Sequence, residues 1–172
     1  MAHKLVYWTS TTLPNQWNIS LAATEAGLCY LGLPHDSAQA LEEWVTEHLP
    51  LYQGVEDDAP LAPYIAELSE YFSGIRHTFS LPLDLHGTTF QLAVWQELLR
   101  IPYGETRSYQ DIAVEIGRPH ATRAVGGANG ANPVPIIVPC HRVIGKNGTL
   151  TGYSGGLDVK TTLLQLEGLL MV

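Results

Sequence analysis

The segment 133–145 constrains the fold of this chain more than any other stretch; it reads Pro-Val-Pro-Ile-Ile-Val-Pro-Cys-His-Arg-Val-Ile-Gly. Proline fixes φ and pushes the residue before it towards extended geometry, so Val134 and Val138 are not expected to be helical. We expect a stiff, extended and mostly buried segment that leaves Cys140 little freedom to reorient. A lone cysteine in an apolar segment is more commonly a buried structural residue. Here His141 and Arg142 lie directly beside the thiol, where they favour a reactive thiolate.

The composition indicates a globular chain without a membrane segment. Hydrophobic residues make up 45% of the 172 residues, enough to form a buried core in one domain or two small ones. The start, Met-Ala-His-Lys, lacks the features of a signal peptide, and no apolar run approaches the roughly 20 residues of a membrane helix. Cys29 and Cys140 form no closely spaced pair, which fits a reducing compartment better than a disulfide scaffold. We therefore expect a cytoplasmic protein, associated with the nucleoid if the source is bacterial.

Charge is distributed unevenly along the chain. Residues 1–85 hold two basic and eleven acidic side chains, a net charge of −9, whereas residues 86–172 hold seven and six, a net charge of +1. No acid lies between residues 116 and 157, a stretch with four basic residues: Arg118, Arg123, Arg142 and Lys146. Binding of a polyanion depends on the local field rather than on the net charge of the whole chain. Nucleic acid is therefore expected to bind the C-terminal half.

The first half, residues 1–85, is expected to be a small α/β scaffold domain. Strands are predicted at residues 5–9, 17–22 and 27–33, with a hairpin turn at residues 24–27 between the second and third. These strands predict a three-stranded, mainly antiparallel sheet.

Two helices are expected in the same half of the chain. Asp36 is predicted to cap the first, which runs to Leu49, and the second covers residues 61–72. Cys29 lies on the third strand and is interpreted as a packed core residue. No metal is expected, because no metal-ligand spacing relates the four candidate ligands His3, Cys29, His35 and His86.

The second half, residues 86–172, is predicted to be a helical module. Thr88 and Gln91 have the spacing of a capping box, and the helix that they open has an apolar face of Leu92, Trp95, Leu98 and Leu99. A second helix is expected to begin at Ser108, with Asp111 completing its cap, and to end near residue 117. A third follows after only two residues, so the pair has helix-turn-helix spacing.

The third predicted helix, residues 120–128, has almost no bulky side chains. Arg123 is its one long side chain, and the rest are mainly small: Ala121, Ala124, Gly126, Gly127 and Ala128. Such a helix either packs tightly on a neighbour or lets its backbone approach a groove of DNA. Small residues suit the shallow minor groove better than the major groove, where longer side chains reach the base edges. We interpret Arg123 as a wedge into the base stack.

Residues 88–168 strongly resemble the C-terminal domain of the O6-alkylguanine-DNA alkyltransferases, also called methylated-DNA–protein-cysteine methyltransferases. Six motifs occur in one order: Phe90-Gln-x-x-Val-Trp95, Ile101-Pro-Tyr-Gly-Glu-Thr-x-Ser-Tyr109, Arg123-Ala-Val-Gly-Gly-Ala128, Asn132-Pro-Val-Pro135, Pro139-Cys-His-Arg-Val143 and Tyr153-Ser-Gly-Gly156. Residues 1–85 resemble only loosely the family's variable, ribonuclease-H-like N-terminal domain. The resemblance implies an α+β protein with a C-terminal winged helix-turn-helix domain.

The family resemblance also implies a reaction. Cys140 is the nucleophile that takes the alkyl group from O6-alkylguanine and, less readily, from O4-alkylthymine. His141 is the base that draws off the thiol proton, directly or through a water, and Glu167 orients its imidazole. Whether His141 reaches both partners depends on how the chain folds back. Because a thioether has no easy route back to a thiol, each molecule is expected to act once, without a cofactor.

Other residues are assigned roles towards DNA and the base by the same resemblance. The target base must leave the stack before a thiol can reach it. Arg123 takes its place, Tyr109 displaces the 3′ phosphate and donates to guanine N3, and Ala124 and Gly126 lie against the minor groove. The carbonyls of Cys140 and Val143 accept from the exocyclic amine of guanine, and Ser154 donates near O6. Four residues complete the site: the hinge residue Asn132, and Pro135, Tyr153 and Lys160 in or near the alkyl pocket.

The expected partner is double-stranded DNA with alkylated bases, bound by a monomer; cooperative binding along DNA stays open. Two other classes are compatible with parts of the sequence. A noncatalytic relative that binds alkylated DNA would share most motifs but lack the cysteine. A cysteine hydrolase would use the same Cys–His pair on an acyl substrate and turn over repeatedly.

Overall fold

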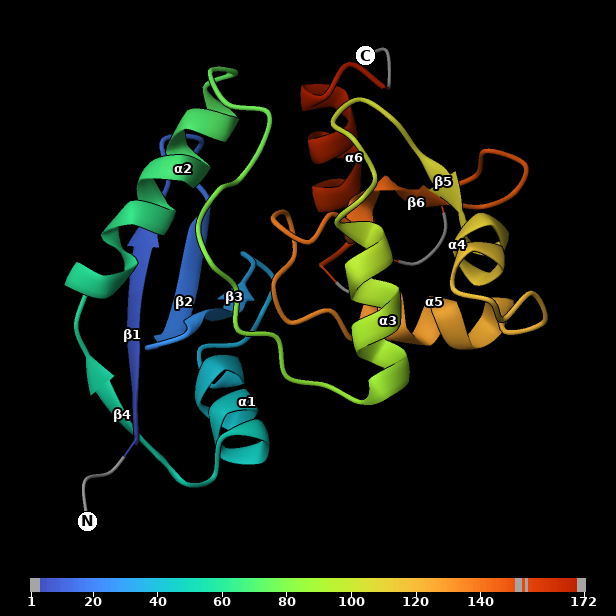
Figure 1. Ribbon diagram of the computed structural model, residues 1–172. Coiled ribbons are helices and arrows are strands. Elements are labelled where there is room, and N and C mark those ends of the chain that lie inside the picture. The colour runs from blue at the N-terminus through green and yellow to red at the C-terminus, as the bar shows by residue number, and fades with distance from the viewer. Residues whose placement is uncertain (1–3, 151–152, 154, 170–172) are drawn as a thin grey trace. The chain divides into compact units, whose positions relative to one another are not determined.

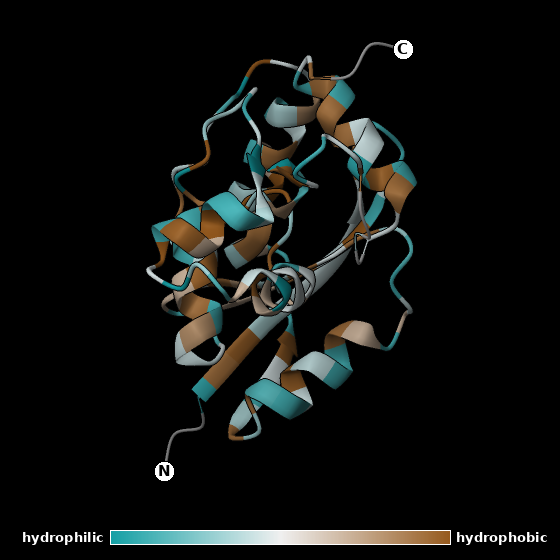
Figure 2. Ribbon diagram, turned by 90° about the vertical axis from the view of Figure 1, so that its right-hand side faces the viewer, coloured by the Kyte–Doolittle hydropathy of each residue, from teal (hydrophilic) through white to brown (hydrophobic). Residues whose placement is uncertain are grey.

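The computed structural model describes residues 4–150, 153 and 155–169. The chain divides into two compact units, Met1–His86 and Gly87–Val172. The first combines a sheet with two helices and the second is mainly helical, so the expected α+β class is confirmed (Figure 1). Both strands and helices carry hydrophobic and hydrophilic residues side by side along the ribbon (Figure 2). None of the helices within the described residues is long and apolar enough to cross a membrane.

The N-terminal unit is built on a four-stranded sheet in the order β3-β2-β1-β4. Its strands are β1 (Lys4–Thr12), β2 (Asn18–Thr24), β3 (Gly27–Gly32) and β4 (Tyr52–Glu56). Neighbouring strands among the first three pair antiparallel, as predicted, whereas β4 pairs parallel to β1. The predicted count of three strands was wrong because β4 is a short edge strand. Its side chains are exposed or half-buried and lack the alternation that marks a half-buried strand.

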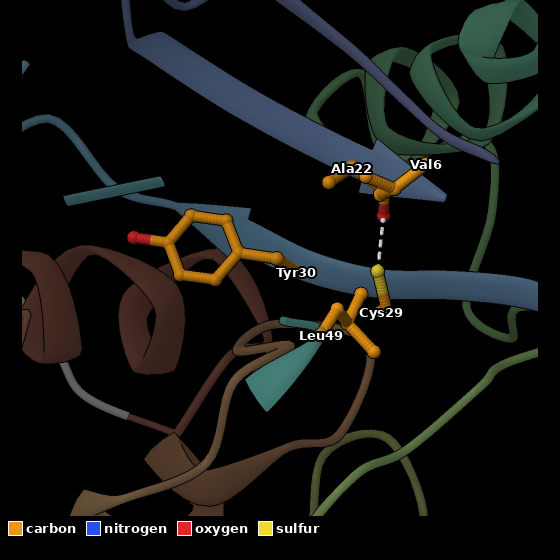
Figure 3. Packing of buried hydrophobic residues seen from close by; sticks show 5 residues of the cluster. All are labelled: Val6, Ala22, Cys29, Tyr30 and Leu49. Atoms are coloured by element: carbon orange, nitrogen blue, oxygen red, sulfur yellow. Dashed lines mark hydrogen bonds between the residues drawn. The ribbon is translucent and has the colours of Figure 1, made fainter. Parts of the chain in front are cut away.

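Cys29 lies in the core of this unit, as predicted. Figure 3 shows it on β3 among Val6, Ala22, Tyr30 and Leu49. Its sulfur donates to the carbonyl of Ala22 at 3.3 Å, and burial, with a smaller effect from the charge of Asp84, raises the thiol pKa to about 12. This thiol is therefore protonated at any physiological pH, which fits a structural role.

The helices of the N-terminal unit are α1 (Ala40–His48), the short 3₁₀ turn η1 (Ala59–Leu61) and α2 (Ala62–Phe72). The prediction that Asp36 caps α1 was wrong, because the helix begins at Ala40 with Gln39 as the N-cap residue. The Asp36 carboxylate instead accepts from the backbone N–H of Leu33 at 2.7 Å. Aspartate stabilises turns through such local bonds as readily as it caps helices, so the sequence signal was ambiguous.

The connecting segment after α2 belongs to the N-terminal unit. The N–H of Leu28 donates to the carbonyl of Pro82 at 3.1 Å, and the N–H of Asp84 donates back to Leu28 at 2.8 Å. A Cβ atom on Gly27 would lie 2.5 Å from the Pro82 oxygen, and this glycine has φ +149°. Only glycine therefore allows the hairpin turn and the connecting segment to lie so close.

Within its described residues, the C-terminal unit has four α-helices, one 3₁₀ turn and two short strands. They are α3 (Thr89–Leu98), β5 (Arg107–Ser108), α4 (Tyr109–Glu115), α5 (Thr122–Gly130), η2 (Cys140–Arg142), β6 (Val143–Ile144) and α6 (Leu157–Leu166), of which η2 is a 3₁₀ turn. Both predicted capping boxes are present, Thr88 with Gln91 and Ser108 with Asp111. The strands β5 and β6 pair in parallel.

Trp95 connects α3 to α5 inside this unit. Its side chain is 1% exposed, and its indole N–H donates to the carbonyl of Ala128 at 2.8 Å. The buried face of α3 includes Val94 and Leu98, whereas Leu99, predicted to lie on the same face, is 38% exposed. Helix α5 starts two residues later than predicted, at Thr122, because Ala121 serves as its N-cap.

Candidate active site

The segment 133–145 is buried, but it is not the extended segment that its prolines predicted. The N–H of Val138 donates to Val134 at 2.9 Å, a bond of helical spacing. Two three-residue turns follow one another, with Ile137 bonded to Pro135 at 2.9 Å and Cys140 bonded to Val138 at 2.8 Å. Proline restricts its own φ but leaves ψ free, so hydrogen bonds could fold the segment into turns.

Each of the two turns has an identifiable geometry. Pro139 has φ −82° and ψ 64°, the inverse γ-turn that suits proline, and this turn leads directly into the 3₁₀ turn at Cys140. Ile136 has φ +72°, which is rare for a β-branched residue. Such a conformation costs on the order of 1–3 kcal/mol and persists only where the surroundings fix it. The backbone that leads to Cys140 is thus held in a strained form.

Asn132, predicted as a hinge residue, holds this strained backbone from within. Its Nδ2 donates to the carbonyl of Val138 at 2.8 Å, and its Oδ1 accepts from the N–H of Val134 at 2.9 Å. A second amide, Asn129 at the end of α5, donates to the carbonyl of Cys140 at 3.4 Å. Sequence reasoning missed Asn129, since nothing local distinguishes it from the small residues around it.

The thiol of Cys140 is 2% exposed and lies 3.7 Å from the hydroxyl of Tyr153. Burial raises its pKa, while hydrogen bonds from Asn132 and Tyr153 and the charge of Lys160 act in the opposite direction. Desolvation is the largest of these effects, and neither His141 nor Arg142, which were expected to favour a thiolate, is among the groups that oppose it. The thiol therefore needs a base to accept its proton during reaction.

His141 is fully buried, and its Nε2 lies 2.7 Å from Oε2 of Glu167. An ionised carboxylate can only accept, so Nε2 carries the hydrogen and Nδ1 of the neutral ring is an acceptor. Nδ1 is buried and has no hydrogen-bond partner among the residues that the structure describes. Burial lowers the pKa of His141, helped by the charges of Arg142 and Lys160 and opposed by Glu167. The ring is thus a neutral base with one nitrogen available.

Arg142 completes this cluster and was not predicted as a site residue. Its Nε and Nη2 donate to the two oxygens of Glu167 at 2.8 and 3.0 Å, and its Nη1 donates to the carbonyl of Ile101 at 2.7 Å. Glu167 also accepts from the N–H of Gly104 at 3.3 Å. A guanidinium in an apolar segment needs an anion when buried, and that was the available signal. Its partner lies 25 positions further along the chain, beyond the reach of local patterns.

Lys160 is fully buried on α6, and its Nζ donates to the carbonyl of Val143 at 2.6 Å. The same ammonium lies 5.9 Å from the centre of the Tyr153 ring. Burial lowers the pKa of Lys160, and the nearby Cys140 opposes that shift. Lys160 therefore lies where its charge can favour a thiolate at Cys140 while it holds the Val143 carbonyl in place.

Replacing Lys160 with methionine is expected to slow any reaction of the Cys140 thiolate. The loss of the ammonium raises the pKa of Cys140, and each unit lowers the thiolate fraction up to tenfold. The deficit is expected near pH 7 and to shrink as pH rises, because the thiol ionises regardless at high pH. The rate of the Cys140 reaction, measured between pH 6 and pH 10 in both proteins, tests this. Lys146→Met, a substitution at an exposed lysine, is the matched control. An equal deficit at every pH would contradict the electrostatic role.

The residues predicted to face DNA lie on α4 and α5. Arg123 and Ala124 are exposed in the first turn of α5, and Tyr109 is half-buried at the start of α4. A Cβ atom built on Gly126 would lie 3.9 Å from the Tyr109 ring, so these two helices approach closely there. Pro135 is buried in the turn beside Ile136, and Ser154 lies outside the described residues.

Metal ligation has no candidate within the described part of the chain. No group of three or more histidine, cysteine, aspartate or glutamate side chains is arranged there to hold an ion. Of the four candidate ligands considered from the sequence, Cys29 is packed in the core and His3 lies outside the described residues.

Fold and site together define a two-domain protein whose helical domain holds a buried cysteine next to a histidine–glutamate–arginine cluster. The model of the 6-O-methylguanine DNA methyltransferase DNA binding domain matches residues 89–169, and that of the ribonuclease-like domain of the same proteins matches residues 6–85. The chain belongs to the methylated-DNA–protein-cysteine methyltransferase family.

Individual relatives agree with the family models. The inducible methylated-DNA–protein-cysteine methyltransferase of Bacillus subtilis (strain 168) is 51% identical over 162 residues, which cover 94% of this chain and 90% of that protein. The methyltransferase of Mycobacterium leprae (strain TN) is 57% identical over 111 residues, 64% of this chain and 67% of that protein. The crystal structure of Mycobacterium tuberculosis OGT in complex with DNA has a TM-score of 0.79 and 42% identity, covering 94% of this chain and 92% of that chain.

Proposed function

We propose that this protein repairs DNA by extruding O6-alkylguanine and, less readily, O4-alkylthymine and moving the alkyl group irreversibly to Cys140. The observation that carries the proposal is the buried pair of His141 and Glu167, whose nitrogen and oxygen lie 2.7 Å apart, with His141 directly following the buried Cys140 in the sequence. Such a pair can accept a proton from a thiol whose pKa is raised by burial. Membership of the methylated-DNA–protein-cysteine methyltransferase family supports the same reaction.

The chemical step follows from the arrangement of these groups. The Cys140 proton passes through a water to Nδ1 of His141, and the thiolate attacks the alkyl carbon of the lesion. A carbon–sulfur bond forms while the bond between that carbon and O6 breaks, and the base, still attached to the DNA, takes up a proton and is restored to guanine. Tyr109 donates to guanine N3 and Ser154 donates near O6, where charge develops. The carbonyls of Cys140 and Val143 accept from the exocyclic amine.

On the DNA side, we assign the α5 surface to the minor groove. Arg123 fills the space of the extruded base, and the small residues Ala124 and Gly126 let the helix backbone approach the groove. The absence of acids between residues 116 and 157 removes repulsion from phosphates along this part of the sequence. The partner is double-stranded DNA with alkylated bases, bound by a monomer. Cytoplasmic location fits a thiol that must stay reduced, and both cysteines are free.

The stoichiometry of alkyl transfer distinguishes this function from the two alternatives, a cysteine hydrolase and a noncatalytic DNA-binding relative. The reaction makes a thioether, and Cys29 is packed in the N-terminal core, where it is not available to resolve it. We expect one alkyl group per protein molecule and then no further reaction, measured as labelled methyl transferred from DNA in excess over protein. Repeated turnover would indicate a hydrolase, and binding without transfer would indicate a noncatalytic relative.

Changing Arg123 to alanine is expected to lower alkyl transfer from duplex DNA by about tenfold or more, because the opened stack loses the side chain that fills it. Transfer from the free base O6-benzylguanine, which needs no extrusion, is expected to stay at the wild-type rate. Single-turnover rates with both substrates measure the difference. Arg100→Ala, which removes an exposed arginine two residues after α3, is the control for loss of charge alone. Equal loss on both substrates would refute the role in extrusion.

A further inference from the structure

We propose that Arg142 is a positioning residue for alkyl transfer: it balances the charge of Glu167, so that His141 keeps a neutral ring with Nδ1 open to accept a proton. This role rests on the function proposed above, since it concerns the base of that reaction. In this role Arg142 acts through Glu167 and His141.

The first observation that supports this role of Arg142 is the geometry around Glu167. The carboxylate has two oxygens, and Arg142 binds both, at 2.8 and 3.0 Å, while His141 shares one of them at 2.7 Å. Side chains of all three residues are buried, with Arg142 7% exposed and the other two fully enclosed. A planar two-point pairing of this kind fixes the carboxylate plane and thereby the direction of the bond to the imidazole.

The charge balance of the cluster is the second observation that supports a positioning role for Arg142. One carboxylate and one guanidinium cancel, and arginine cannot lose its proton in a protein. A neutral His141 then completes a cluster with no net charge, which is the state that burial tolerates. Without Arg142 the buried carboxylate would lose the guanidinium that binds both of its oxygens, and a proton taken up from solvent at Nδ1 of His141 would restore a positive charge beside it. A doubly protonated ring has no lone pair and cannot act as the base.

Other charged and titratable groups around the ring reinforce this assignment. Lys160 on α6 adds a second positive charge, Cys140 is neutral in its resting form, and Tyr103 donates its hydroxyl proton to Leu166 at 3.1 Å. Glu167 is the anion that favours an imidazolium. Arg142 and Lys160 both lower the pKa of His141 in addition to the effect of burial. Arg142 binds Glu167 directly through Nε and Nη2.

Ring nitrogen NMR of the intact protein tests the charge state without relying on activity. At pH 7 the wild-type His141 is expected to be neutral with its proton on Nε2, and His141→Gln identifies its signals among the seven histidines. In Arg142→Met the ring is expected to titrate at higher pH. Single-turnover transfer at pH 7 is expected to fall about tenfold and to recover at higher pH, as the ring loses its extra proton.

Two further variants separate charge from geometry. Arg142→Lys keeps the charge but lacks the two-point pairing, so its ring is expected to stay neutral at pH 7 while transfer slows at every pH. Arg142→Met combined with Glu167→Gln removes both charges, and the titration of His141 is expected to return towards that of the wild type. A purely structural Arg142 predicts no such return.

Several outcomes would overturn the assignment. The first is a doubly protonated His141 ring in the wild-type protein at pH 7, which the wild-type spectra alone would show. A folded Arg142→Met with unchanged ring titration and an unchanged pH profile is another, as is a charged ring at pH 7 in Arg142→Lys. If Arg142→Met does not fold, the wild-type and Arg142→Lys spectra still decide. A wild-type protein that transfers no alkyl group would refute the proposed function and leave the charge state of His141 to be judged by these spectra.

Discussion

Cys140→Ser is expected to abolish alkyl transfer, with a loss of roughly a thousandfold or more, the scale seen when an enzyme loses its nucleophile. A serine hydroxyl is far less acidic than a thiol, and the neutral His141 beside it is too weak a base to ionise it fully. In the wild type, incubation with duplex DNA that contains O6-methylguanine is expected to add one methylene to the peptide that holds Cys140. Intact and peptide mass spectrometry measure both results.

Cys29 provides the matched control for this experiment. It is the other cysteine of the chain, and its thiol is buried in the N-terminal core with a pKa of about 12. Cys29→Ala is therefore expected to leave methylation of Cys140 intact. A methyl group found on Cys29, or a folded protein whose Cys140 stays unmethylated after incubation with the methylated DNA, would contradict the assignment of the nucleophile.

Trp95→Ala is expected to destabilise the C-terminal unit by about 3–5 kcal/mol, the range for truncating a buried aromatic side chain. The side chain is 1% exposed, so its removal leaves a cavity between α3 and α5. It also removes the indole donor from the Ala128 carbonyl, which keeps its bond from the N–H of Ala131 at 3.2 Å, so this loss adds about 0.5–1.5 kcal/mol. Because α5 carries Arg123, transfer from duplex DNA is expected to fall as well.

Urea unfolding followed by circular dichroism measures the change, with Trp95→Phe as the milder variant that keeps most of the ring and loses the N–H. The other three tryptophans, Trp8, Trp17 and Trp44, all lie in the N-terminal unit, so tryptophan fluorescence of Trp95→Ala reports on that unit separately. If the urea unfolding transition followed by circular dichroism is unchanged in Trp95→Ala, the indole does not stabilise the core of the C-terminal unit.

Local sequence signals predicted elements whose stabilising contacts lie within a few residues. The capping boxes at Thr88 and Ser108 each join residues three positions apart, and both are present. The first three strands were recognisable from their apolar and β-forming residues, and every residue of β3 is buried, whereas the exposed edge strand β4 left no such pattern. The prediction for Asp36 was wrong for a related reason: its carboxylate can accept from a nearby turn N–H as well as from a helix N-terminus, and here it accepts from Leu33.

The candidate site shows the same division between local and distant contacts. The motif around Cys140 identified the family, and it is the basis on which we propose the nucleophile and the base, because residue type and spacing alone distinguish that chemistry. The motif did not indicate that burial raises the pKa of the thiol, or that Asn129 at the end of α5 holds the Cys140 carbonyl. Both depend on which side chains pack around the sulfur, and packing is decided by parts of the chain far apart in sequence.

The composition of segment 133–145 predicted a rigid, extended and buried segment that holds the proposed nucleophile Cys140, and the burial is confirmed. Only the tertiary structure decided its path through two tight turns, one of them strained at Ile136. It also decided that Glu167, 25 positions beyond Arg142, binds that residue and His141 together. Proline restricts one dihedral angle locally, whereas hydrogen bonds and ion pairs between distant residues select among the paths that remain.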